Sequence, residues 1–205
     1  MLNRQAHRVR RPRTRSRPLP QRALEDLRFI RETMERSSTF TATPGWGQVG
    51  MGLIAIAAAF IAARQPSVGA WLATWLLAAL VAVTIAVAAM QIKAHRAGLP
   101  LTSGPGRQFA FSFLPCVVVA LLLTVALARL GLNRLLPGVW LSLYGAGIVT
   151  GGAFSIPLLP AMGFCFLATG TVALFMPAWG NGLMAVAFGG VHIVFGIWIA
   201  RKHGG

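Results

Sequence analysis

The sequence predicts an all-α membrane protein in which six transmembrane helices follow a short amphipathic cytoplasmic helix. Three observations lead to this prediction. First, 56% of the 205 residues are hydrophobic and only 11% are charged, whereas a soluble domain carries about a quarter charged residues. Second, the hydrophobic residues gather into six long runs, most of them close to the ~20 residues that cross a bilayer. Third, the chain has only 4 acidic residues, and all of them precede the first run.

Residues 1–21 are rich in Arg and Pro and contain few hydrophobic side chains. Such a segment cannot bury enough apolar surface to offset its chain entropy, so we expect a disordered basic arm. Arg10 and Arg11 resemble part of a twin-arginine signal, but the first apolar run begins far downstream and no small-residue cleavage site follows. We therefore expect no signal peptide here. Each Arg near a membrane surface is attracted to anionic lipids by about 1 kcal/mol, so anionic lipids are the expected partner and nucleic acid is not.

The spacing of charged and apolar residues in 22–36 predicts an amphipathic interfacial helix. Three of its four acidic residues stand four positions from an Arg, and such pairs add only about 0.2–0.5 kcal/mol each to a helix. The location of the helix is therefore set by its apolar stripe, which we expect to lie on lipid or on a protein partner. The stripe supplies the candidate interaction residues Leu24, Leu27, Phe29, Ile30 and Met34. A polar linker, 37–46, then leads to the membrane.

The transmembrane domain is predicted over residues 47–205. Its six apolar runs are 47–63, 71–89, 109–128, 139–154, 158–175 and 183–200. If the N-terminus is cytoplasmic, that side receives 16 Lys and Arg residues and the opposite side receives 3, namely Arg64, Arg129 and Arg134. Because cytoplasmic loops carry an excess of basic residues, we expect a multi-pass protein of the bacterial inner membrane with both termini in the cytoplasm.

No Asp or Glu follows Glu35, and the six runs contain no Lys or Arg away from their ends. Membrane pumps, ion-coupled transporters and membrane hydrolases normally place ionisable side chains at depth. Their absence argues against carboxylate proton relays, paired-carboxylate catalysis and a Ser-His-Asp triad in this region. It argues equally against a metal site that uses carboxylate ligands. We therefore predict a non-enzymatic protein that needs no metal or cofactor.

His192 is the one histidine deep in an apolar run, and it is a further candidate interaction residue. An imidazole can ligate haem or copper, or bind a quinone oxygen, but no second histidine lies in a run to complete a bis-histidine site. The alternative is an interhelical hydrogen bond, which is worth about 0.6 kcal/mol on average. We favour this second interpretation because His192 has no evident partner ligand.

Other polar side chains in the runs are mostly Thr and Ser, which we expect to bond back to their own helices. Tyr144, the only tyrosine, is the most notable of the polar group because it lies near Gly145 and Gly147. Cys116 and Cys165 both lie inside runs, and we expect them to be small apolar core residues.

Glycines mark two of the predicted helices as packing surfaces. Gly147 and Gly151 form a G-x-x-x-G motif in the fourth run, and Gly189 and Gly190 are adjacent in the sixth. Small residues allow helices to approach closely in lipid, where no hydrophobic force drives them together. We therefore predict that the fourth and sixth runs touch each other, or that they pack against a second copy of the chain.

Three stretches together resemble an uncharacterised family of small bacterial six-span integral membrane proteins: "DLRFIRETMERSSTFTATPGWG", "LYGAGIVTGGAFS" and "GGVHIVFGIWIARKHGG". The resemblance extends over about residues 24–205 and does not include the Arg-rich arm. It implies a six-span protein of the bacterial inner membrane, and it implies no catalytic or ligand-binding residue.

Three functional hypotheses follow. The first is a non-enzymatic membrane protein that acts through contacts of its basic cytoplasmic face with lipid or with a protein partner, as a monomer or a homo-oligomer. The second is a small transporter or channel for a neutral or apolar solute. The third is a membrane enzyme or redox protein centred on His192. We favour the first because it accounts for the acid-bearing helix and for the absence of charge in the six runs.

Overall fold

The computed structural model describes residues 24, 26–28, 44–96, 104–153 and 155–203. The chain divides into two units, Met1–Ser37 and Ser38–Gly205. Within the described residues, the second unit consists of helices with short connections, and six helical segments are long and apolar enough to cross a membrane. These observations confirm the predicted all-α fold with six transmembrane helices.

Four of the six spans are each a single helix: α2 (Gly45–Ala62), α3 (Val68–Arg96), α4 (Gly104–Arg129) and α6 (Leu158–Phe175). The fourth span begins with the 3-10 turn η1 (Asn133–Leu135) and continues as α5 (Leu136–Gly152). The last span is composite, and its pieces are the 3-10 turn η2 (Pro177–Trp179), α7 (Gly180–Met184), the π-helix η3 (Ala185–Val191) and α8 (His192–His203). Each predicted apolar run overlaps one span. Helix α3 continues past its run because polar helix-forming residues such as Gln91 and Lys93 extend it beyond the apolar part.

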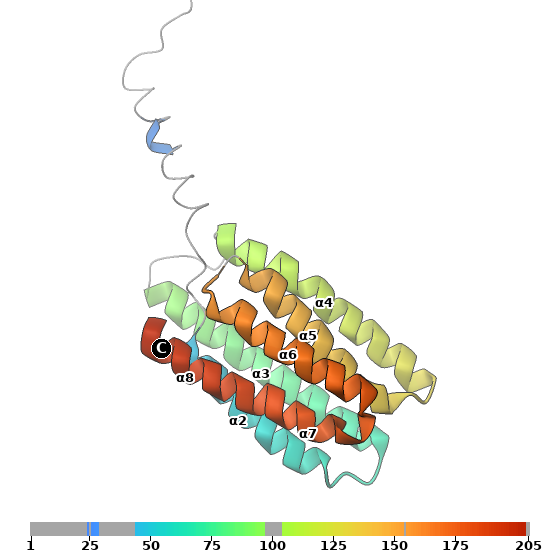
Figure 1. Cartoon of the computed structure of the whole chain (residues 1–205). Coiled ribbons are helices and arrows are strands. Elements are labelled where there is room, and N and C mark those ends of the chain that lie inside the picture. Colours follow the sequence, from blue (N-terminus) through green and yellow to red (C-terminus); the bar gives the residue numbers. More distant parts are fainter. Residues whose placement is uncertain (1–23, 25, 29–43, 97–103, 154, 204–205) are drawn as a thin grey trace, which may run out of the picture. The chain divides into compact units, whose positions relative to one another are not determined.

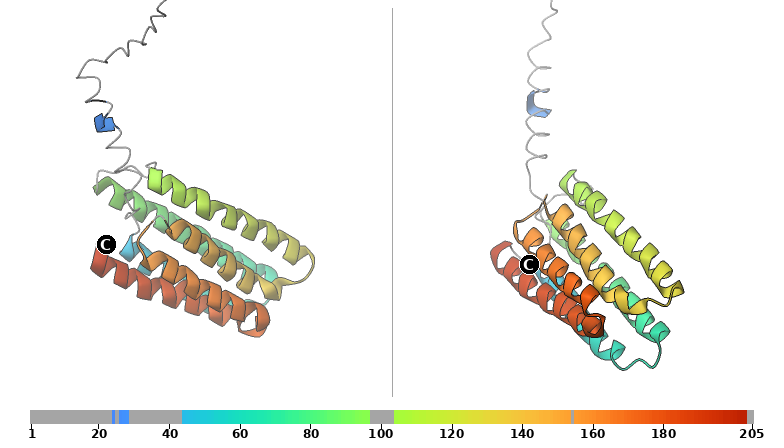
Figure 2. Two further views of the ribbon diagram at one scale, coloured as in Figure 1. Left: turned by 45° about the horizontal axis from the view of Figure 1, so that its top comes forward. Right: turned by 45° about the vertical axis from the view of Figure 1, so that its right-hand side comes forward.

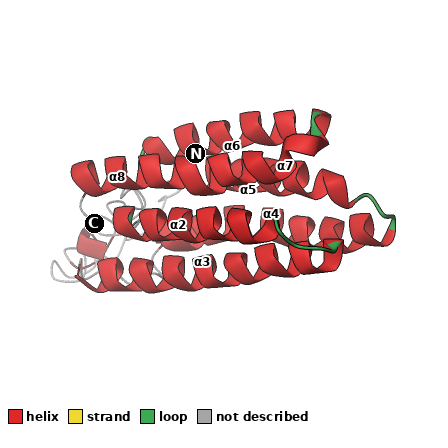
Figure 3. Ribbon diagram, turned by 90° about the horizontal axis from the view of Figure 1, so that it is seen from below, coloured by secondary structure: helices red, strands yellow, loops and turns green. Residues whose placement is uncertain are grey.

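The six spans form two layers of three helices. In one layer α2 lies between α3 and α8, and in the other α5 lies between α4 and α6 (Figures 1 and 2). Figure 3 shows the first of these layers from below, with α2 between α8 and α3. The layers therefore do not follow the order of the chain. The third span, α4, lies in the layer of α5 and α6, and the sixth span, with α8, lies in the layer of α2 and α3.

The two layers meet along one edge and separate along the other. At the joined edge the last span contacts α6, and its α7 piece also contacts α5. At the opposite edge α3 and α4, although consecutive in the chain, hardly touch. We call the edge between α3 and α4 the open edge.

Glycines bring the central helix of each layer close to a neighbour. A Cβ atom on Gly45 of α2 would meet the backbone of Ala200 in α8, and one on Gly145 of α5 would meet the carbonyl oxygen of Gly163 in α6. Close approach of this kind is how helices associate in lipid. Because the start of α2 lies against the end of α8, both ends of the six-span bundle are on the same side.

Local signals fix where several helices begin and end. The N–H of Ala70 donates to Oγ of Ser67 at 3.2 Å, so Ser67 caps the start of α3. Gly131, with φ of 71°, follows the end of α4, and the N–H of Leu132 donates to the carbonyl of Leu127 at 2.9 Å. This is the Schellman arrangement, which requires a left-handed residue and favours glycine.

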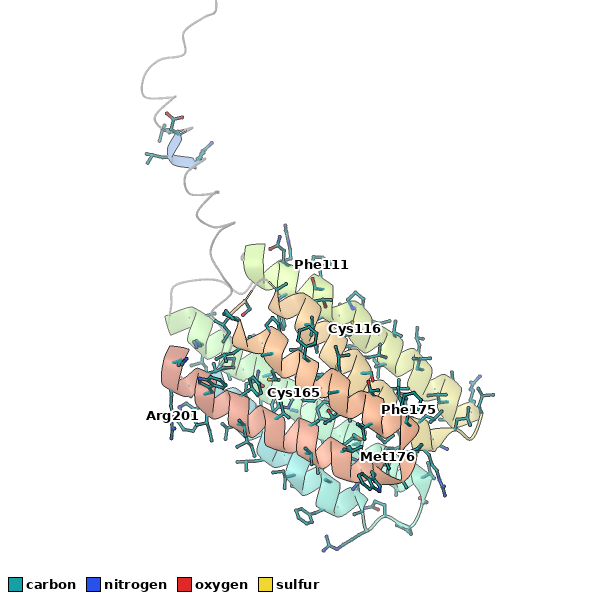
Figure 4. All side chains as sticks on the ribbon, in the orientation of Figure 1. Phe111, Cys116, Cys165, Phe175, Met176 and Arg201 are labelled. Carbon is teal, nitrogen blue, oxygen red and sulfur yellow. The ribbon has the colours of Figure 1, made fainter. Side chains whose placement is uncertain are left out.

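Large apolar side chains cover the outside of the bundle, as expected for a surface that faces lipid. Figure 4 labels Phe111 and Phe175, which are 70% and 83% exposed. Cys165 is exposed as well, Cys116 is half-buried, and both thiols are free. The expectation that both cysteines are core residues is therefore wrong for Cys165, since an apolar run does not reveal which side of a helix faces the bundle.

In the first unit, residues 24 and 26–28 are helical, and the stripe residues Leu24 and Leu27 are 61% and 62% exposed. The other members of the predicted stripe, Phe29, Ile30 and Met34, lie outside the described residues, as does the basic arm.

Basic residues occur at both ends of the bundle. On the side where α2 starts they are Lys93, Arg96, Arg107, Arg201 and Lys202, and on the other side they are Arg64, Arg129 and Arg134. Residues 37–205 thus contribute 5 against 3, and the larger asymmetry of the whole sequence comes from the Arg residues of 1–36.

Candidate functional site

A cavity of about 300 Å³ lies between the two layers at the open edge. Its walls include one stripe of side chains on α3, from Trp75 to Met90, and one on α4, from Phe109 to Thr124. Each stripe extends over 15 residue steps, which is about 22 Å at ~1.5 Å per residue. The cavity is therefore elongated along the helices and bordered by the two spans that hardly touch.

The lining of the cavity is almost entirely apolar. On α3 it is Trp75, Leu76, Ala78, Ala79, Ala82, Val83, Ala86 and Met90, and on α4 it is Phe109, Phe113, Cys116, Val117, Ala120, Leu121 and Thr124. Four alanines on α3 leave room where larger side chains would fill the gap between the layers. Among the described residues, no Asp, Glu, Lys or Arg lines the cavity.

A hydrogen bond between the layers borders the cavity. The hydroxyl of Tyr144 on α5 and Nε2 of His192 on α8 are 2.8 Å apart, and both residues line the cavity. The hypothesis that His192 makes an interhelical hydrogen bond is confirmed, but its partner is the hydroxyl of Tyr144 and not the carbonyl, Thr or Ser that we expected. The fourth and sixth predicted runs therefore do touch, and this pair joins them.

Aromatic rings surround the Tyr144–His192 pair. Phe188, one turn before His192, stacks on its imidazole with centroids 6.1 Å apart and planes at 17°. Phe166 of α6 is 4.8 Å from the Tyr144 ring and 5.2 Å from the imidazole. Phe113 of α4 meets Tyr144 edge-on at 5.5 Å. These contacts hold both polar side chains in fixed orientations, because each ring is packed on more than one side.

Two polar atoms at the cavity make no hydrogen bond in the described part of the chain. They are Oε1 of Gln48 on α2 and Nδ1 of His192. Gln48 and His192 are only 4% and 3% exposed, and the two atoms themselves have almost no accessible surface. The backbone of Phe188 and Ala187 lies close enough to the imidazole to interact with it. A buried polar atom without a partner is unusual and costs about 1–3 kcal/mol.

A group of hydrogen-bonded side chains lies beside the other end of the cavity, where Trp75 and Trp140 line it. Oδ1 of Asn181 accepts from the indole N–H groups of Trp71 and Trp75 at 3.1 Å each, and its Nδ2 donates to the carbonyl of Ala59 at 3.1 Å. Trp140 stacks on Trp71 with centroids 5.7 Å apart. We call this group the Asn181 clasp, and it ties α2, α3 and the last span together.

Trp140 also links the clasp end of the cavity to α4. Its indole N–H donates to Oγ1 of Thr124 at 2.8 Å, and the Thr124 hydroxyl donates to the carbonyl of Ala120 at 2.7 Å. Thr84 and Thr171 likewise donate to carbonyls four residues earlier. This confirms, for these threonines, that their hydroxyls bond to their own helices.

The last span is π-helical just before His192. The π-helix η3 covers Ala185–Val191 and includes Phe188, Gly189 and Gly190. A π-helix is rare in proteins and often lies at a functional site, because its i→i+5 bonds are weaker than those of an α-helix. Here it adjoins His192, which lines the cavity.

The four predicted packing glycines do not face one another. A Cβ on Gly147 would meet Phe113 and Cys116 of α4, and one on Gly151 would meet Phe109 of the same helix. Gly189 lies against Ile56 of α2, and Gly190 has nothing within 4 Å of the Cβ position. Three of the four therefore do pack, but against α4 and α2 rather than between the fourth and sixth runs.

Sequence reasoning found one member of this site and missed most of the others. His192 lies at the cavity, whereas the described stripe residues Leu24 and Leu27 belong to the other unit. Gln48 was missed, although it is the only glutamine inside an apolar run and that signal was available. The stripes on α3 and α4 could not be found from the sequence, because their residues are ordinary for lipid-facing helices.

Among the described residues, no group of three or more His, Cys, Asp or Glu side chains could hold a metal ion. No protein-family model, curated protein or solved structure matches the chain. The fold and the site therefore define the class: a six-span helical membrane protein with an apolar cavity between two three-helix layers.

Proposed function

We propose that this protein is a membrane-embedded binding protein or transporter for a neutral, largely apolar molecule, which it takes from the bilayer through the open edge. The observation that carries this proposal is the cavity between α3 and α4, which is elongated and apolar and has no charged side chain among the described residues that line it. Ligand sites are typically cavities of about 300–1,000 Å³ with apolar walls and a few polar groups, and this cavity lies at the lower end of that range.

Lateral access is favoured over an open pore. At one end of the cavity Trp75 and Trp140 belong to a hydrogen-bonded group, so a path along the bundle axis would have to disturb these bonds. At the open edge, by contrast, α3 and α4 are not closely packed, and the side chains that line the cavity there are almost all apolar. An apolar molecule already dissolved in the bilayer would therefore meet no polar barrier on its way in.

Photolabelling in lipid vesicles tests this proposal. The probe is a long-chain alkane that carries a diazirine and no polar group, and labelled residues are mapped by mass spectrometry. We expect label on cavity residues such as Val117 and Ile148, in addition to label on the lipid-facing surface. The variant Ala82→Trp, which fills the middle of the cavity, should lower the cavity labelling about tenfold, because an indole would occupy the space.

Ala88→Trp is the matched control, because Ala88 is on the same helix, exposed and not part of the lining. It should leave the cavity labelling unchanged. Labelling confined to lipid-facing residues, or equal cavity labelling in the wild type and Ala82→Trp, would overturn the proposal.

A second proposal concerns the basic face. Leu24 and Leu27 are three residues apart in a helical segment, and both are exposed. Exposed leucines beside many Arg residues suit a contact with anionic lipid or with an acidic partner. Replacing Leu27 and Ile30 by Glu should increase protease access to residues 22–36 in membranes without unfolding the six spans. Unchanged protease access would show that this segment is not docked.

We also propose that the protein lies in a bacterial inner membrane with both termini in the cytoplasm. The support is the excess of basic residues, 16 against 3, on that side. A fluorescent protein fused to the C-terminus should be bright, since such fusions mature in the cytoplasm, and an alkaline phosphatase fused there should be inactive. The opposite pair of results would reverse the orientation.

A further inference from the structure

The polar side chains of the cavity lining leave a ligand little to bind. The Tyr144 hydroxyl is paired with Nε2 of His192, and the indole N–H of Trp75 donates to Oδ1 of Asn181. Oε1 of Gln48 and Nδ1 of His192 have almost no accessible surface. A polar head group that entered the cavity would lose its hydrogen bonds to water and find few new partners. The ligand that fits best is therefore apolar over its whole length.

An apolar ligand of this cavity competes with the chains of the bilayer. Only 6% of the residues in the apolar window of α3, and 6% in that of α4, are buried, so lipid chains lie along the open edge. An apolar molecule that moves from lipid into the cavity gains no hydrophobic free energy, because both surroundings exclude water. It displaces lipid chains only if it makes contacts that they cannot make, or if it loses less conformational freedom than they do.

Aromatic rings near both ends of the cavity provide contacts that lipid chains cannot match. Phe109 and Phe113 stack on each other with centroids 5.8 Å apart, and both line the cavity on α4. Trp75 and Trp140 line it at the end beside the Asn181 clasp. Two π-systems attract each other beyond what their buried area contributes. A saturated chain has no π-system, so these rings favour a conjugated molecule.

Between the two groups of rings, small side chains line the α3 wall of the cavity. Ala78, Ala82 and Ala86 are four residues apart and therefore share one side of the helix, and Ala79 lies beside them. This row is about 12 Å long at ~1.5 Å per residue. A straight, rigid molecule can lie along it without changing shape, whereas a flexible chain must be held extended and loses conformational entropy.

These observations select one class of molecule. Resting on the proposed function, we propose that the ligand is a rod-shaped conjugated polyene without a polar head group, which lies between α3 and α4 parallel to the helices. Its π-system contacts the rings at both ends of the two stripes, and its rigidity spares the entropy that a saturated lipid chain would lose. The stripes, about 22 Å long at ~1.5 Å per residue, limit the length of the rod.

Competition against the photoreactive alkane tests this inference in lipid vesicles. The competitors have the same number of carbon atoms: diphenylhexatriene is a rigid conjugated rod, diphenylhexane has the same skeleton with a flexible saturated linker, and octadecane has no ring. We expect diphenylhexatriene to halve the labelling of Val117 and Ile148 at a membrane concentration about tenfold lower than diphenylhexane, a difference of about 1.4 kcal/mol. Octadecane should be the weakest competitor. Cavity labelling is expressed relative to that of lipid-facing residues in the same sample, so that light absorbed by the polyene cancels.

Two variants test the contribution of the rings. Phe109→Leu and Phe113→Leu should each lower the preference for diphenylhexatriene over octadecane about threefold, while labelling by the photoreactive alkane alone stays at its wild-type level. Phe111→Leu is the matched control, because Phe111 is on the same helix, is 70% exposed and does not belong to the lining. It should keep the full preference. If one of the two test variants fails to fold, the other decides the outcome.

The outcomes separate this inference from the proposed function. If the photoreactive alkane does not label the cavity, both fail. If it labels the cavity but diphenylhexatriene and diphenylhexane compete equally, or octadecane competes as strongly as diphenylhexatriene, the cavity accepts any apolar molecule and only the inference is wrong. An undiminished preference in both Phe109→Leu and Phe113→Leu, or an equal loss in Phe111→Leu, would also overturn the inference, because the rings that line the cavity would then not select the ligand.

Discussion

Helices α2 and α5 differ sharply from α3 and α4 in the fraction of their residues that is buried inside the bundle. Within their apolar windows, 44% of residues in α2 and 50% of those in the fourth span are buried, against 6% in α3 and 6% in α4. The less buried pair is also the more hydrophobic. In a bilayer this is expected, because the helices with the largest lipid-facing surface need the most apolar side chains, and burial between helices depends on small residues.

Glycine content follows the same division. Helix α2 has Gly45, Gly47, Gly50 and Gly52, and α5 has five glycines, whereas α3 has only Gly69. The comparison shows that the central helices pack closely because glycines leave room for their neighbours. Helices α3 and α4 have larger side chains and pack less closely, and the cavity lies between them at the open edge.

The largest expected effect comes from adding a side chain to a central helix. In Gly145→Val the new Cβ would lie 2.8 Å from the carbonyl oxygen of Gly163, so α5 and α6 must separate. We expect a loss of about 3 kcal/mol or more in the free energy of unfolding, measured by SDS-induced unfolding in micelles. The matched control is Gly69→Val on α3, where nothing lies within 4 Å of the Cβ position. Equal losses in the two variants would contradict the division between central and outer helices.

A smaller effect is expected at the Asn181 clasp, which joins the outer helix α3 to the rest of its layer. Asn181→Leu removes three hydrogen bonds and leaves two indole N–H groups without their acceptor, whereas the carbonyl of Ala59 keeps its bond from the N–H of Ala63. We expect a loss of about 1–3 kcal/mol, together with a change in tryptophan fluorescence, because Trp71 and Trp75 would no longer be held. Unaltered stability and fluorescence would mean that packing alone positions α3.

The smallest effect is expected on the outer face of α3. Leu80 is 64% exposed, so in Leu80→Ala lipid chains replace the lost methyl groups and the unfolding free energy should change by less than about 0.5 kcal/mol. Leu141→Ala on α5, where the side chain is fully buried, serves as the comparison and should cost about 2–5 kcal/mol. If Leu80→Ala were as costly as Leu141→Ala, the outer face of α3 would have to be covered by protein.

The six spans could be predicted from the sequence, but the cavity could not. The apolar runs predicted six spans because the length and composition needed to cross a bilayer are local properties of the chain. The direction in which each helix faces is not local. The sequence therefore did not reveal that Cys165 is exposed, or that Gly147 packs against α4 and Gly189 against α2. His192 was identified because a histidine is conspicuous in an apolar run, but its partner Tyr144 follows only from the packing of the two layers.

The exchange of the third span between the layers has a consequence for biosynthesis. Gly45 and Gly52 of α2 are covered by the last described span, which follows four other spans along the chain. During translation this side of α2 must remain in the bilayer or be shielded by the insertion machinery until α8 has been made. A nascent chain that stops before α8 would expose Gly45 and Gly52 to neighbouring helices, and cellular quality control would have a clear feature by which to recognise it.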